Sequence, residues 1–483
     1  MKQKLNVLFA AFEAVPFMKT GGLGDVAGSL PRALRQAGCE ARVILPKFGT
    51  IPQQYREQMT PIASFTLRLG WRELYCGIET LTHQGVPYYF VDNEFYFKRE
   101  HIYGYGDDGE RIAFFSKAVV EAIPYLPDFP CDVLHCNDWH TALAPVFLRE
   151  LYQGAEYKRV KTMFTIHNIK FQGIFPDHTL GDVLGLDHIP AAVDQLRFDW
   201  QIINYMKGAL CYSDVLTTVS PTYVEELKHP FYGERLDELF RQRADRLHGI
   251  LNGIDTQFYN PDTDPELAAP YSAAHPEGKA RCKTALRREL ELEEDEAPVV
   301  AMIGRLTEQK GLDLVARVMD ELVDSGLQMV VLGTGEKRYE DMLRHYGQKY
   351  PRRVYVGLRF DEGLSHRVYA GADMLLMPSL FEPCGLSQMI AMRYGTLPVV
   401  RETGGLRDSV IPYNRYTGEG TGFSFANYNA HEMMFTLLGA ADLYRTHRER
   451  WQGLVANAMA TDFGWERAAE QYLALYQHQC GQD

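Results

Sequence analysis

Residues 379–405 have the sequence SLFEPCGLSQMIAMRYGTLPVVRETGG, and the rest of the fold can be worked out from this stretch. A short apolar run, Met374–Met377, comes just before it and predicts a buried parallel strand. Glu382 lies in the bend that follows, which is rich in Pro, Cys and Gly, and a helix-like run over Leu386–Tyr394 comes next. The plainest interpretation is a strand–turn–helix with a capping glutamate.

A second apolar run, Leu397–Val400, leads into the turn Thr403–Gly405. A carboxylate and a glycine-rich turn therefore follow two successive strands. Doubly wound sheets bind ligands at the carboxyl ends of their strands. The stretch thus predicts a ligand site as well as a sheet.

The same alternation of apolar runs and helical patterns continues through the chain, which predicts an α/β fold with parallel sheets. Helices are predicted over Val26–Gln36 and Arg111–Ile123, and a hairpin insertion within 57–100. The further predicted strands are Leu5–Phe9, Arg42–Leu45, Tyr88–Val91, Val133–His135, Met163–Ile166, Leu216–Val219, Val299–Ile303, Met329–Leu332 and Val354–Val356.

A length of 483 residues predicts two domains. The Asn-Gly and Asn-Pro turns of HGILNGIDTQFYNP, residues 248–261, mark the boundary between them. We expect an N-terminal domain over 1–250 and a C-terminal domain over 251–461. A last helix, Trp465–Gln477, has apolar residues at helical spacing that suit either domain.

The net charge of −13 weighs against a nucleic acid partner. The eight cysteines form no CxxC pair, which favours a reducing cytoplasm. No apolar stretch approaches the roughly 20 residues of a membrane helix. The N-terminus has two lysines and an apolar run, but Asn6 interrupts the run, so a first strand is expected there rather than a signal peptide.

The first candidate site is KTGGLGD, Lys19–Asp25, between a strand and a helix. Its glycines let backbone N–H groups approach an anion, and Lys19 adds a positive charge. The spacing fits neither the dinucleotide-binding nor the P-loop pattern. A plain turn between strand and helix is the alternative.

The second candidate is GRLTEQKG, which places Arg305 and Lys310 where a strand ends. We expect Thr307 to cap the next helix and Lys310 to lie in its first turn. A cation there opposes the helix dipole, and a bound diphosphate would remove that conflict. Surface charges on a loop are the alternative.

The third candidate combines His135, Asp138 and His140 with His167 and Asn168. Histidines beside a carboxylate raise a metal site as one interpretation. The His135/His140 spacing is not that of a helical pair and no second carboxylate accompanies them, so no metal is expected. The DxD motif at 262–264 follows no strand and is interpreted as a solvated loop.

Together these motifs resemble the family of bacterial glycogen synthases and plant starch synthases. The resemblance runs from Lys4 to Tyr476. It rests on KTGGLGDV at 19 with Glu13 upstream, NDWHTALAP at 137, TIHNIKFQG at 165, TVSPTY at 218, LNGID at 251, GRLTEQKGLDL at 304, FEPCGLSQ at 381 and YGTLPVVRETGGL at 394.

The resemblance implies a glycosyltransferase of the B type, with two Rossmann-like domains facing a deep cleft and the C-terminal helix, 462–483, returning to the N-terminal domain. It implies transfer of glucose from ADP-glucose to the non-reducing end of an α-1,4-glucan, with retention and without a metal or other cofactor. No nucleic acid or membrane partner is implied.

The resemblance also implies roles for individual residues. The catalytic set is Glu382 on the glucose hydroxyls, His167 at the glucose end, Asp138 on the acceptor side, and Arg305 and Lys310 on the donor diphosphate. The substrate-binding set is Glu13, Lys19, Gly21, Gly22, Asp25, Asn168, Asn252, Phe360, Cys384, Gly385, Leu386, Thr403, Gly404 and Gly405, in which Lys19 and Gly22 reach the diphosphate and Phe360 stacks on the base.

Two positions depart from related enzymes. Ile390 stands where many retaining enzymes of this fold have a second glutamate for the ribose; the synthase branch usually lacks that glutamate too. Glu402 stands where the bacterial family often has arginine; it either weakens phosphate binding or faces solvent.

Three alternatives stay open: the same reaction with UDP-glucose, a catalytically silent glucan-binding scaffold, and transfer to a small acceptor. The aromatic region Tyr88–Tyr105 fits either sugar stacking over an extended acceptor or core packing.

Overall fold

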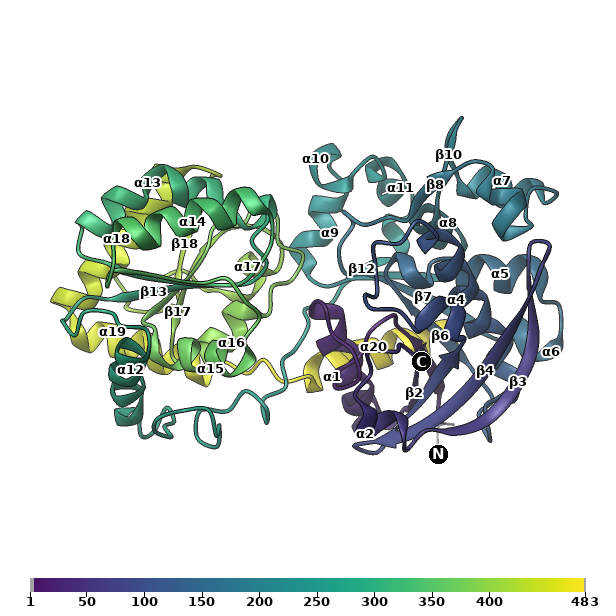
Figure 1. The fold of residues 1–483 in the computed structure, drawn as a ribbon, viewed down its shortest axis with the longest axis horizontal. Helices are drawn as coiled ribbons and strands as arrows, with labels where there is room; N and C mark the ends of the chain where they lie inside the picture. Colours follow the sequence, from purple (N-terminus) through teal and green to yellow (C-terminus); the bar gives the residue numbers. More distant parts are fainter. Residues whose placement is uncertain (1–3, 482–483) are drawn as a thin grey trace. The chain divides into compact units, whose positions relative to one another are not determined.

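The structure is a computed structural model that describes residues 4–481. The chain forms two compact units (Figure 1). Unit 1 comprises Met1–Gly253 and Trp465–Asp483, and unit 2 comprises Ile254–Gly464. The chain thus passes between units at 253/254 and 464/465, against the expected 250/251 and 461/462. Both units are α/β, as predicted.

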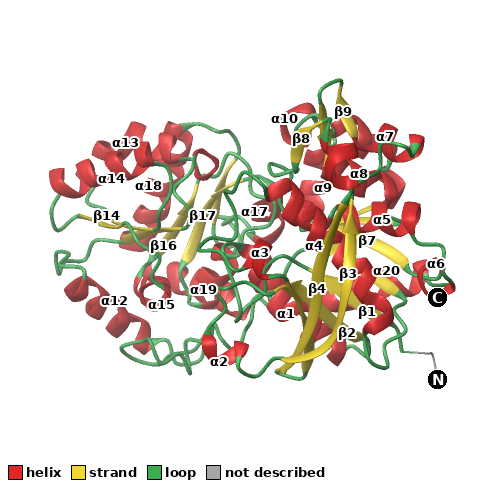
Figure 2. Cartoon of the chain, turned by 45° about the vertical axis from the view of Figure 1, so that its right-hand side comes forward, coloured by secondary structure: helices red, strands yellow, loops and turns green. Residues whose placement is uncertain are grey.

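Unit 1 is built on a nine-stranded sheet in the order β12-β11-β7-β6-β1-β2-β5-β4-β3. All neighbours from β12 to β5 pair in parallel, whereas β3 and β4 are antiparallel additions that Figure 2 shows as two long adjacent arrows. The insertion predicted within 57–100 is therefore a hairpin. The strands are β1 Asn6–Ala10, β2 Glu40–Pro46, β3 Thr60–Leu69, β4 Arg72–His83, β5 Val86–Asp92, β6 Val133–Asn137, β7 Lys161–Ile166, β11 Val215–Thr218 and β12 Leu247–Gly249.

Helices cover this sheet, and a small three-stranded sheet lies beside them. The helices are α1 Gly22–Gln36, α2 Gln53–Arg56, α3 Glu94–Phe97, α4 Asp108–Ala122, α5 Leu143–Leu151, α6 Ala155–Lys158, α7 Pro190–Leu196, α8 Tyr205–Tyr212, α9 Pro221–Leu227, α10 Pro230–Gly233, α11 Asp237–Gln242 and α20 Glu466–Gln479. The small sheet is β8 Ile174–Pro176, β10 Ile202–Asn204 and β9 Arg197–Asp199.

The last helix, α20, packs on unit 1, which answers the question that its sequence left open. Tyr472 and Tyr476 are fully buried, and the Tyr476 hydroxyl lies 2.7 Å from Nδ1 of His135 in β6. The aromatic region 88–105 is largely core as well, since Tyr88, Tyr89 and Tyr96 are buried. These aromatic residues are therefore not a sugar platform.

Unit 2 is a six-stranded parallel sheet in the order β15-β14-β13-β16-β17-β18. Its central strands have near-continuous apolar sequences because helices lie over both faces. The strands are β13 Val299–Ile303, β14 Gln328–Leu332, β15 Val354–Gly357, β16 Met374–Met377, β17 Leu397–Arg401 and β18 Phe423–Phe425. The helices are α12 Glu277–Glu289, α13 Leu312–Asp324, α14 Lys337–Lys349, α15 Glu362–Gly371, α16 Ser387–Arg393, α17 Gly404–Ser409, α18 Ala430–Thr446 and α19 Arg448–Ala460.

Among the described residues, no helix is both long enough and apolar enough to cross a membrane.

Candidate active site

Glu382 lies in the loop after β16 and forms the centre of the candidate site in unit 2. Its Oε2 accepts hydrogen bonds from Nζ of Lys310 at 2.6 Å and from Oγ of Ser379 at 3.0 Å. The Glu382 side chain is only 7% exposed, whereas that of Lys310 is 25% exposed. The buried carboxylate is therefore paired, and the ammonium that pairs with it remains open to a ligand.

The loop that carries Glu382 is held by its neighbours. Arg401, the last residue of β17, donates from Nε to the carbonyl of Ser379 at 2.7 Å and also bonds the carbonyl of Leu380. Gln309 donates its side-chain N–H to the carbonyl of Phe381 at 3.2 Å. Sequence reasoning missed Arg401 and Ser379, because a residue that acts through the backbone of another segment leaves no motif.

The turn Thr403–Gly405 packs directly against the Glu382 loop. The Gly405 N–H donates to the carbonyl of Glu382 at 3.1 Å. A Cβ at Gly404, whose φ is +43°, would lie 1.9 Å from that carbonyl oxygen, and one at Gly405 would lie 2.2 Å from the carbonyl oxygen of Cys384. Both positions require glycine, because the two turns approach too closely for a side chain.

Replacing Gly404 by Ala is therefore expected to destabilise unit 2 by about 3 kcal/mol, from left-handed strain plus the clash. The midpoint of urea unfolding measures this. Gly418→Ala is a matched control, since Gly418 also has a positive φ, +79°, but an added Cβ would meet no atom of the described residues within 4 Å. Equal midpoints for the two variants would contradict the close approach.

The structure corrects the predicted setting of Lys310. Lys310 ends a short 3₁₀ turn, Glu308–Lys310, and α13 begins only at Leu312, after Gly311 with φ +69°. Thr307 does occupy the capping position but makes no side-chain capping bond. Glycine in the left-handed region broke the helix that the sequence pattern had suggested. Lys310 thus lies outside the helix, and the charge of Glu382 balances it.

The remaining predicted residues of unit 2 differ in exposure. Cys384 is buried, and the Gln388 side-chain N–H bonds the carbonyls of Cys384 and Gly385, which fixes that bend. Leu386 occupies the N-cap position of α16. Arg305 is exposed at the end of β13, and Phe360 is 80% exposed. Both side chains are thus exposed, unlike the buried residues that hold the Glu382 loop.

Glu402 is exposed, and its carboxylate accepts a hydrogen bond from Oγ of Ser424 at 2.7 Å. Of the two possibilities raised by the sequence, this position fits the solvent-facing one. The prediction that residues 262–264 form a solvated loop is wrong at Asp264. That side chain is buried and bonds the Tyr394 hydroxyl and Nδ1 of His366, the latter at 2.6 Å.

In unit 1, the loop Lys19–Asp25 leads into α1. Lys19 pairs with Asp25, Nζ to Oδ1, at 2.7 Å. Glu13 is buried and accepts from the backbone N–H and, at 2.8 Å, from the hydroxyl of Thr20. Burial raises the pKa of Glu13. Gly21 precedes the helix and Gly22 begins it. Glu13 therefore shapes the glycine loop from behind, while Lys19 is partly exposed.

Asp138 follows β6 in a backbone conformation that is rare for a side-chain-bearing residue, with φ +55°. Its Oδ1 accepts from the backbone N–H of His167 at 2.7 Å and of Asn168 at 3.3 Å. Nε2 of His167 lies 2.9 Å from Oδ1 of Asn137. Strain of this kind gathers at functional sites. The ends of β6 and β7 are thus joined through one carboxylate.

The three histidines at these strand ends are held neutral. Burial lowers the pKa of His135, His140 and His167 to about 3 in each case. His135 lies between Tyr476 and Thr165, and His140 stacks on Phe12 at 4.8 Å. Within residues 4–481, no group of three or more His, Cys, Asp or Glu side chains is arranged to hold a metal ion. The first two histidines therefore serve packing.

Burial, with the nearby Glu13 charge, raises the pKa of Asp138 to about 7, although the two backbone N–H groups act against it. Between pH 4 and pH 7 the Asp138 carboxyl is therefore protonated in the folded chain and ionised in the unfolded chain. The contribution of Asp138 to the free energy of unfolding is then largest below pH 4 and is lost as the pH rises through about 7.

In the Asp138→Asn variant the side chain is a neutral amide that does not titrate in this pH range. The stability of this variant relative to the parent is expected to rise by up to about 4 kcal/mol between pH 4 and pH 8, at about 1.4 kcal/mol per pKa unit. Urea midpoints across this range measure the difference, and the histidine contributions cancel because both proteins share them. Asp262→Asn, at an exposed position, is the control. A difference that does not change with pH would contradict the buried carboxyl.

The structure thus brings the predicted residues into two sets. Unit 2 gathers Lys310, Glu382 and Cys384 with the Thr403–Gly405 turn. Unit 1 gathers Glu13 and the Lys19–Asp25 loop near Asp138, His167 and Asn168. Asn252, also in unit 1, is buried, and its side-chain oxygen has no hydrogen-bond partner among residues 4–481.

Two protein families match successive parts of the chain. The starch synthase catalytic domain matches residues 6–242, and glycosyl transferases group 1 matches residues 283–439. Glycogen synthases of Desulforamulus reducens and Geobacillus stearothermophilus are 51% and 52% identical over 474 and 475 residues, which is 98% of this chain and 98% and 97% of theirs.

Among solved structures, the catalytic domain of starch synthase IV from Arabidopsis thaliana, bound to ADP and acarbose, aligns with a TM-score of 0.92 and 34% identity over 99% of this chain and 100% of that one. A sucrose-phosphate synthase from Thermosynechococcus elongatus shares the fold, with a TM-score of 0.61 and 16% identity over 99% of this chain and 100% of that one. The chain therefore belongs to the glycogen and starch synthase family of retaining glycosyltransferases with the B-type fold.

Proposed function

We propose that this protein is a glycogen synthase that transfers glucose from ADP-glucose to the 4-hydroxyl at the non-reducing end of an α-1,4-glucan, with retention of configuration. The observation that carries the proposal is the Lys310–Glu382 pair, 2.6 Å apart at the carboxyl ends of β13 and β16. The pair sets a cation beside a carboxylate. This supports recognition of a nucleotide sugar, because such a molecule carries a diphosphate next to a hexose with hydroxyl groups.

The donor diphosphate is assigned to Lys310, Arg305 and the backbone N–H groups of the Thr403–Gly405 turn. Negative charge grows on the β-phosphate as the glycosidic bond breaks. Fixed cations and N–H dipoles stabilise that charge without having to reorganise during the reaction. Lys19 and Gly22 are assigned to the same diphosphate in the donor-bound state.

The sugar is assigned to Glu382, whose carboxylate accepts hydrogen bonds from the glucose hydroxyls and orients the ring. The Lys310 and Ser379 bonds fix its rotamer, so little side-chain freedom is lost on binding. The backbone carbonyl of His167 is assigned to the developing positive charge at the anomeric carbon. Asp138 and Asn168 are assigned to the acceptor side, and Asn252 and Cys384 to the pocket lining.

For the chemical step, we propose reaction on one face of the sugar. The incoming 4-hydroxyl attacks the anomeric carbon as the bond to the β-phosphate oxygen breaks. The leaving phosphate takes the hydroxyl proton, so ADP departs and an α-1,4 bond forms. The protein's part is to hold the two substrates in line and to stabilise the departing charge.

The choice of ADP over UDP rests on family membership and on the related starch synthase IV structure, which is described as bound to ADP and acarbose. Phe360 is 80% exposed, so its ring is available to stack on a base. UDP-glucose remains the alternative donor within the same mechanism.

We also propose that no metal takes part, because protein cations and N–H groups are assigned to the charge that a magnesium ion would otherwise neutralise. The eight cysteines are free thiols, which supports the reducing cytoplasm as the compartment. Neither nucleic acid nor membrane is proposed as a partner.

Glucose incorporation into glycogen, with ADP-glucose and UDP-glucose supplied separately and a chelator present, tests the proposal. Incorporation from ADP-glucose at a rate unchanged by the chelator is expected. A preference for UDP-glucose would overturn the donor, and loss of activity with the chelator would overturn the metal-free mechanism. A folded protein that binds glucan but transfers from neither donor would favour the scaffold alternative.

A further inference from the structure

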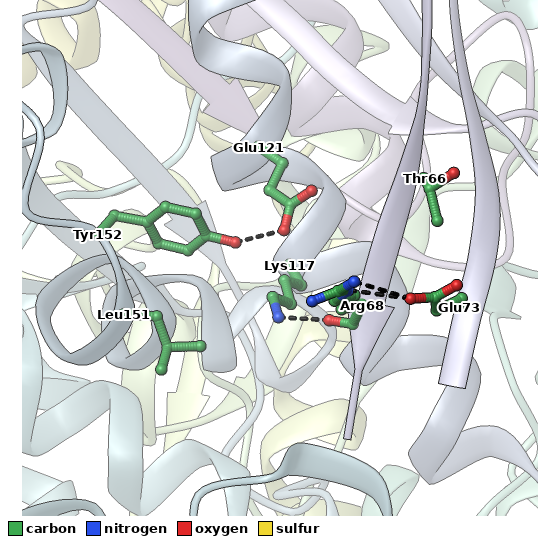
Figure 3. A pocket seen from close by; sticks show the side chains of 7 residues that line it. All are labelled: Thr66, Arg68, Glu73, Lys117, Glu121, Leu151 and Tyr152. Carbon is green, nitrogen blue, oxygen red and sulfur yellow. Dashed lines mark hydrogen bonds and ion pairs between the residues drawn. The ribbon is translucent and has the colours of Figure 1, made fainter. Parts of the chain in front are cut away.

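A hollow of about 630 Å³ lies in unit 1, between the β3–β4 hairpin, α4 and the chain that follows α5 (Figure 3). None of the residues assigned above to the reaction lines it. Its lining residues are Thr66, Arg68, Glu73, Lys117, Glu121, Leu151 and Tyr152.

Lys117 forms the floor of this hollow and is the least exposed charged group there, at 8%. Its Nζ donates to the carbonyl of Arg68, and its charge lies 5.7 Å from the centre of the Phe147 ring. No carboxylate in residues 4–481 forms an ion pair with it. Burial lowers the pKa of Lys117, with Glu121 only partly offsetting the effect. A buried ammonium with one hydrogen bond and no direct ion pair favours an anion beside it, although the Glu121 carboxylate already acts on this charge from nearby.

Arg68 supplies a second cation at the rim. Its side chain is 76% exposed and pairs with Glu73, itself 61% exposed, at 2.9 Å. Exposed pairs of this kind hold together weakly, so the guanidinium can turn toward a ligand at small cost. Figure 3 shows the Lys117 side chain reaching the backbone carbonyl of Arg68, while the Arg68 guanidinium pairs with Glu73.

The other wall suits hydroxyl groups. Glu121 accepts a hydrogen bond from the Tyr152 hydroxyl at 2.5 Å, and both side chains are half-buried. A carboxylate offers further lone pairs to hydroxyl donors. Thr66 adds a hydroxyl of its own at the exposed rim. One side of the hollow thus carries Lys117 and the Arg68–Glu73 pair, while the other side accepts hydrogen bonds.

The hollow shares no lining residue with the candidate active site within unit 1, although Ser116, the neighbour of Lys117 in α4, donates from its hydroxyl to the carbonyl of His140 at 3.1 Å. Lys117 and Glu121 stand in the C-terminal part of α4, whereas Arg111, toward its N-terminus, bonds the carbonyl of Ile102 at 2.9 Å. The next residue, Tyr103, stacks on Phe12, which in turn stacks on His140 beside the strand ends of the site. Occupation of the hollow need not compete with the donor.

We propose that this hollow binds a small organic anion that also carries hydroxyl groups, of the sugar phosphate class, with the anion on Lys117 and Arg68 and hydroxyls on Glu121 and Tyr152. The proposal does not depend on the transferase reaction, because its site shares no residue with the assigned active site.

Calorimetric titration of the full chain with glucose 1-phosphate tests this site. ADP is present in excess throughout, so that a donor site is already filled. Inorganic phosphate serves as the charge-only probe and glucose as the hydroxyl-only probe. One site for glucose 1-phosphate is expected, with binding at least tenfold tighter than that of either probe, since one charged hydrogen bond contributes about 1.5–3 kcal/mol.

Lys117→Met keeps the length of the side chain and removes its charge, so it is expected to weaken this binding at least tenfold. Lys158→Met, at an exposed position on α6, is the matched control and should bind like the parent. Arg68→Gln is a second variant in case Lys117→Met fails to fold, because Arg68 is exposed at the rim and its replacement should not disturb folding. It is expected to weaken binding severalfold.

Binding unchanged in both Lys117→Met and Arg68→Gln would overturn the proposal. If inorganic phosphate bound as tightly as glucose 1-phosphate and Glu121→Gln had no effect, the proposed recognition of hydroxyl groups would be overturned. The hollow would then be an anion site only. The absence of any heat from glucose 1-phosphate with the parent protein would overturn it entirely.

Discussion

Lys310→Met is expected to lower kcat for glucose transfer by about 10²–10³-fold, the usual loss when one fixed group that stabilises transition-state charge is removed. Methionine keeps most of the stem, so the packing of the 3₁₀ turn changes little. The Lys310 charge that we assign to the leaving phosphate disappears, and the Glu382 carboxylate keeps only its bond from Ser379. Initial rates with ADP-glucose and glycogen measure the effect.

The stability of Lys310→Met separates chemistry from folding. The Lys310 side chain is 25% exposed, so loss of its pair is expected to cost only about 1–2 kcal/mol. Lys337→Met, on α14 with an 85% exposed side chain, should behave like the parent in both measurements. Parental kcat in a folded Lys310→Met protein would remove Lys310 from the phosphate site.

Glu382→Gln is the second large effect that we expect, with kcat reduced by about 10²-fold or more. Glutamine has the same shape and can still accept from Ser379, but its amide cannot accept at both ends and carries no charge to pair with Lys310. The glucose ring therefore loses the acceptor that we propose orients it, and misplacement of the sugar by a small distance slows transfer steeply.

Glu402→Gln provides the matched control for this change, because Glu402 is an exposed carboxylate next to the Thr403–Gly405 turn. Its kcat is expected to stay within about twofold of the parent value, as surface substitutions usually do little. If Glu382→Gln and Glu402→Gln gave the same rates, Glu382 would have only a structural role.

The double variant Lys310→Met/Glu382→Gln tests whether the pair acts as a unit. Since the two groups share one hydrogen bond of 2.6 Å, their effects on kcat should not multiply. The double variant is expected to be less than tenfold slower than Lys310→Met alone.

The parallel strands were predictable because each carries a continuous apolar run. Val299–Ile303 and Met374–Met377 match β13 and β16 to the residue, and the other predicted strands differ only at their ends. Turn chemistry was equally informative: the Asn-Gly step near Gly253 lies where the chain leaves unit 1. Local patterns determine such features, so the sequence alone reveals them.

Features that depend on long-range contacts were not predictable. Helix α12 was missed because its stretch is strongly charged, although Gly278, Cys282 and Leu286 form a buried stripe at helical spacing. Asp264 looked like a loop residue, yet His366, 102 positions away in the chain, turns it inward.

Within the candidate site, the motifs identified Glu382, Lys310 and Asp138, but they did not reveal how these residues are held. The Arg401 bonds to the Glu382 loop and the positive φ of Asp138 arise from tertiary packing. The placement of Lys310 just before a helix, rather than in its first turn, depended on the left-handed Gly311. The motifs thus supplied the candidate residues, but not the geometry that holds them in place.

The most direct test of the central claim is the configuration of the bond that the protein makes. Maltooligosaccharide and ADP-glucose labelled with ¹³C at the anomeric carbon are incubated with the protein, and the product is followed by NMR. We expect the label in a new α-1,4 linkage at the non-reducing end, with release of one ADP per glucose. Label in a β linkage, or only in free glucose, would contradict it.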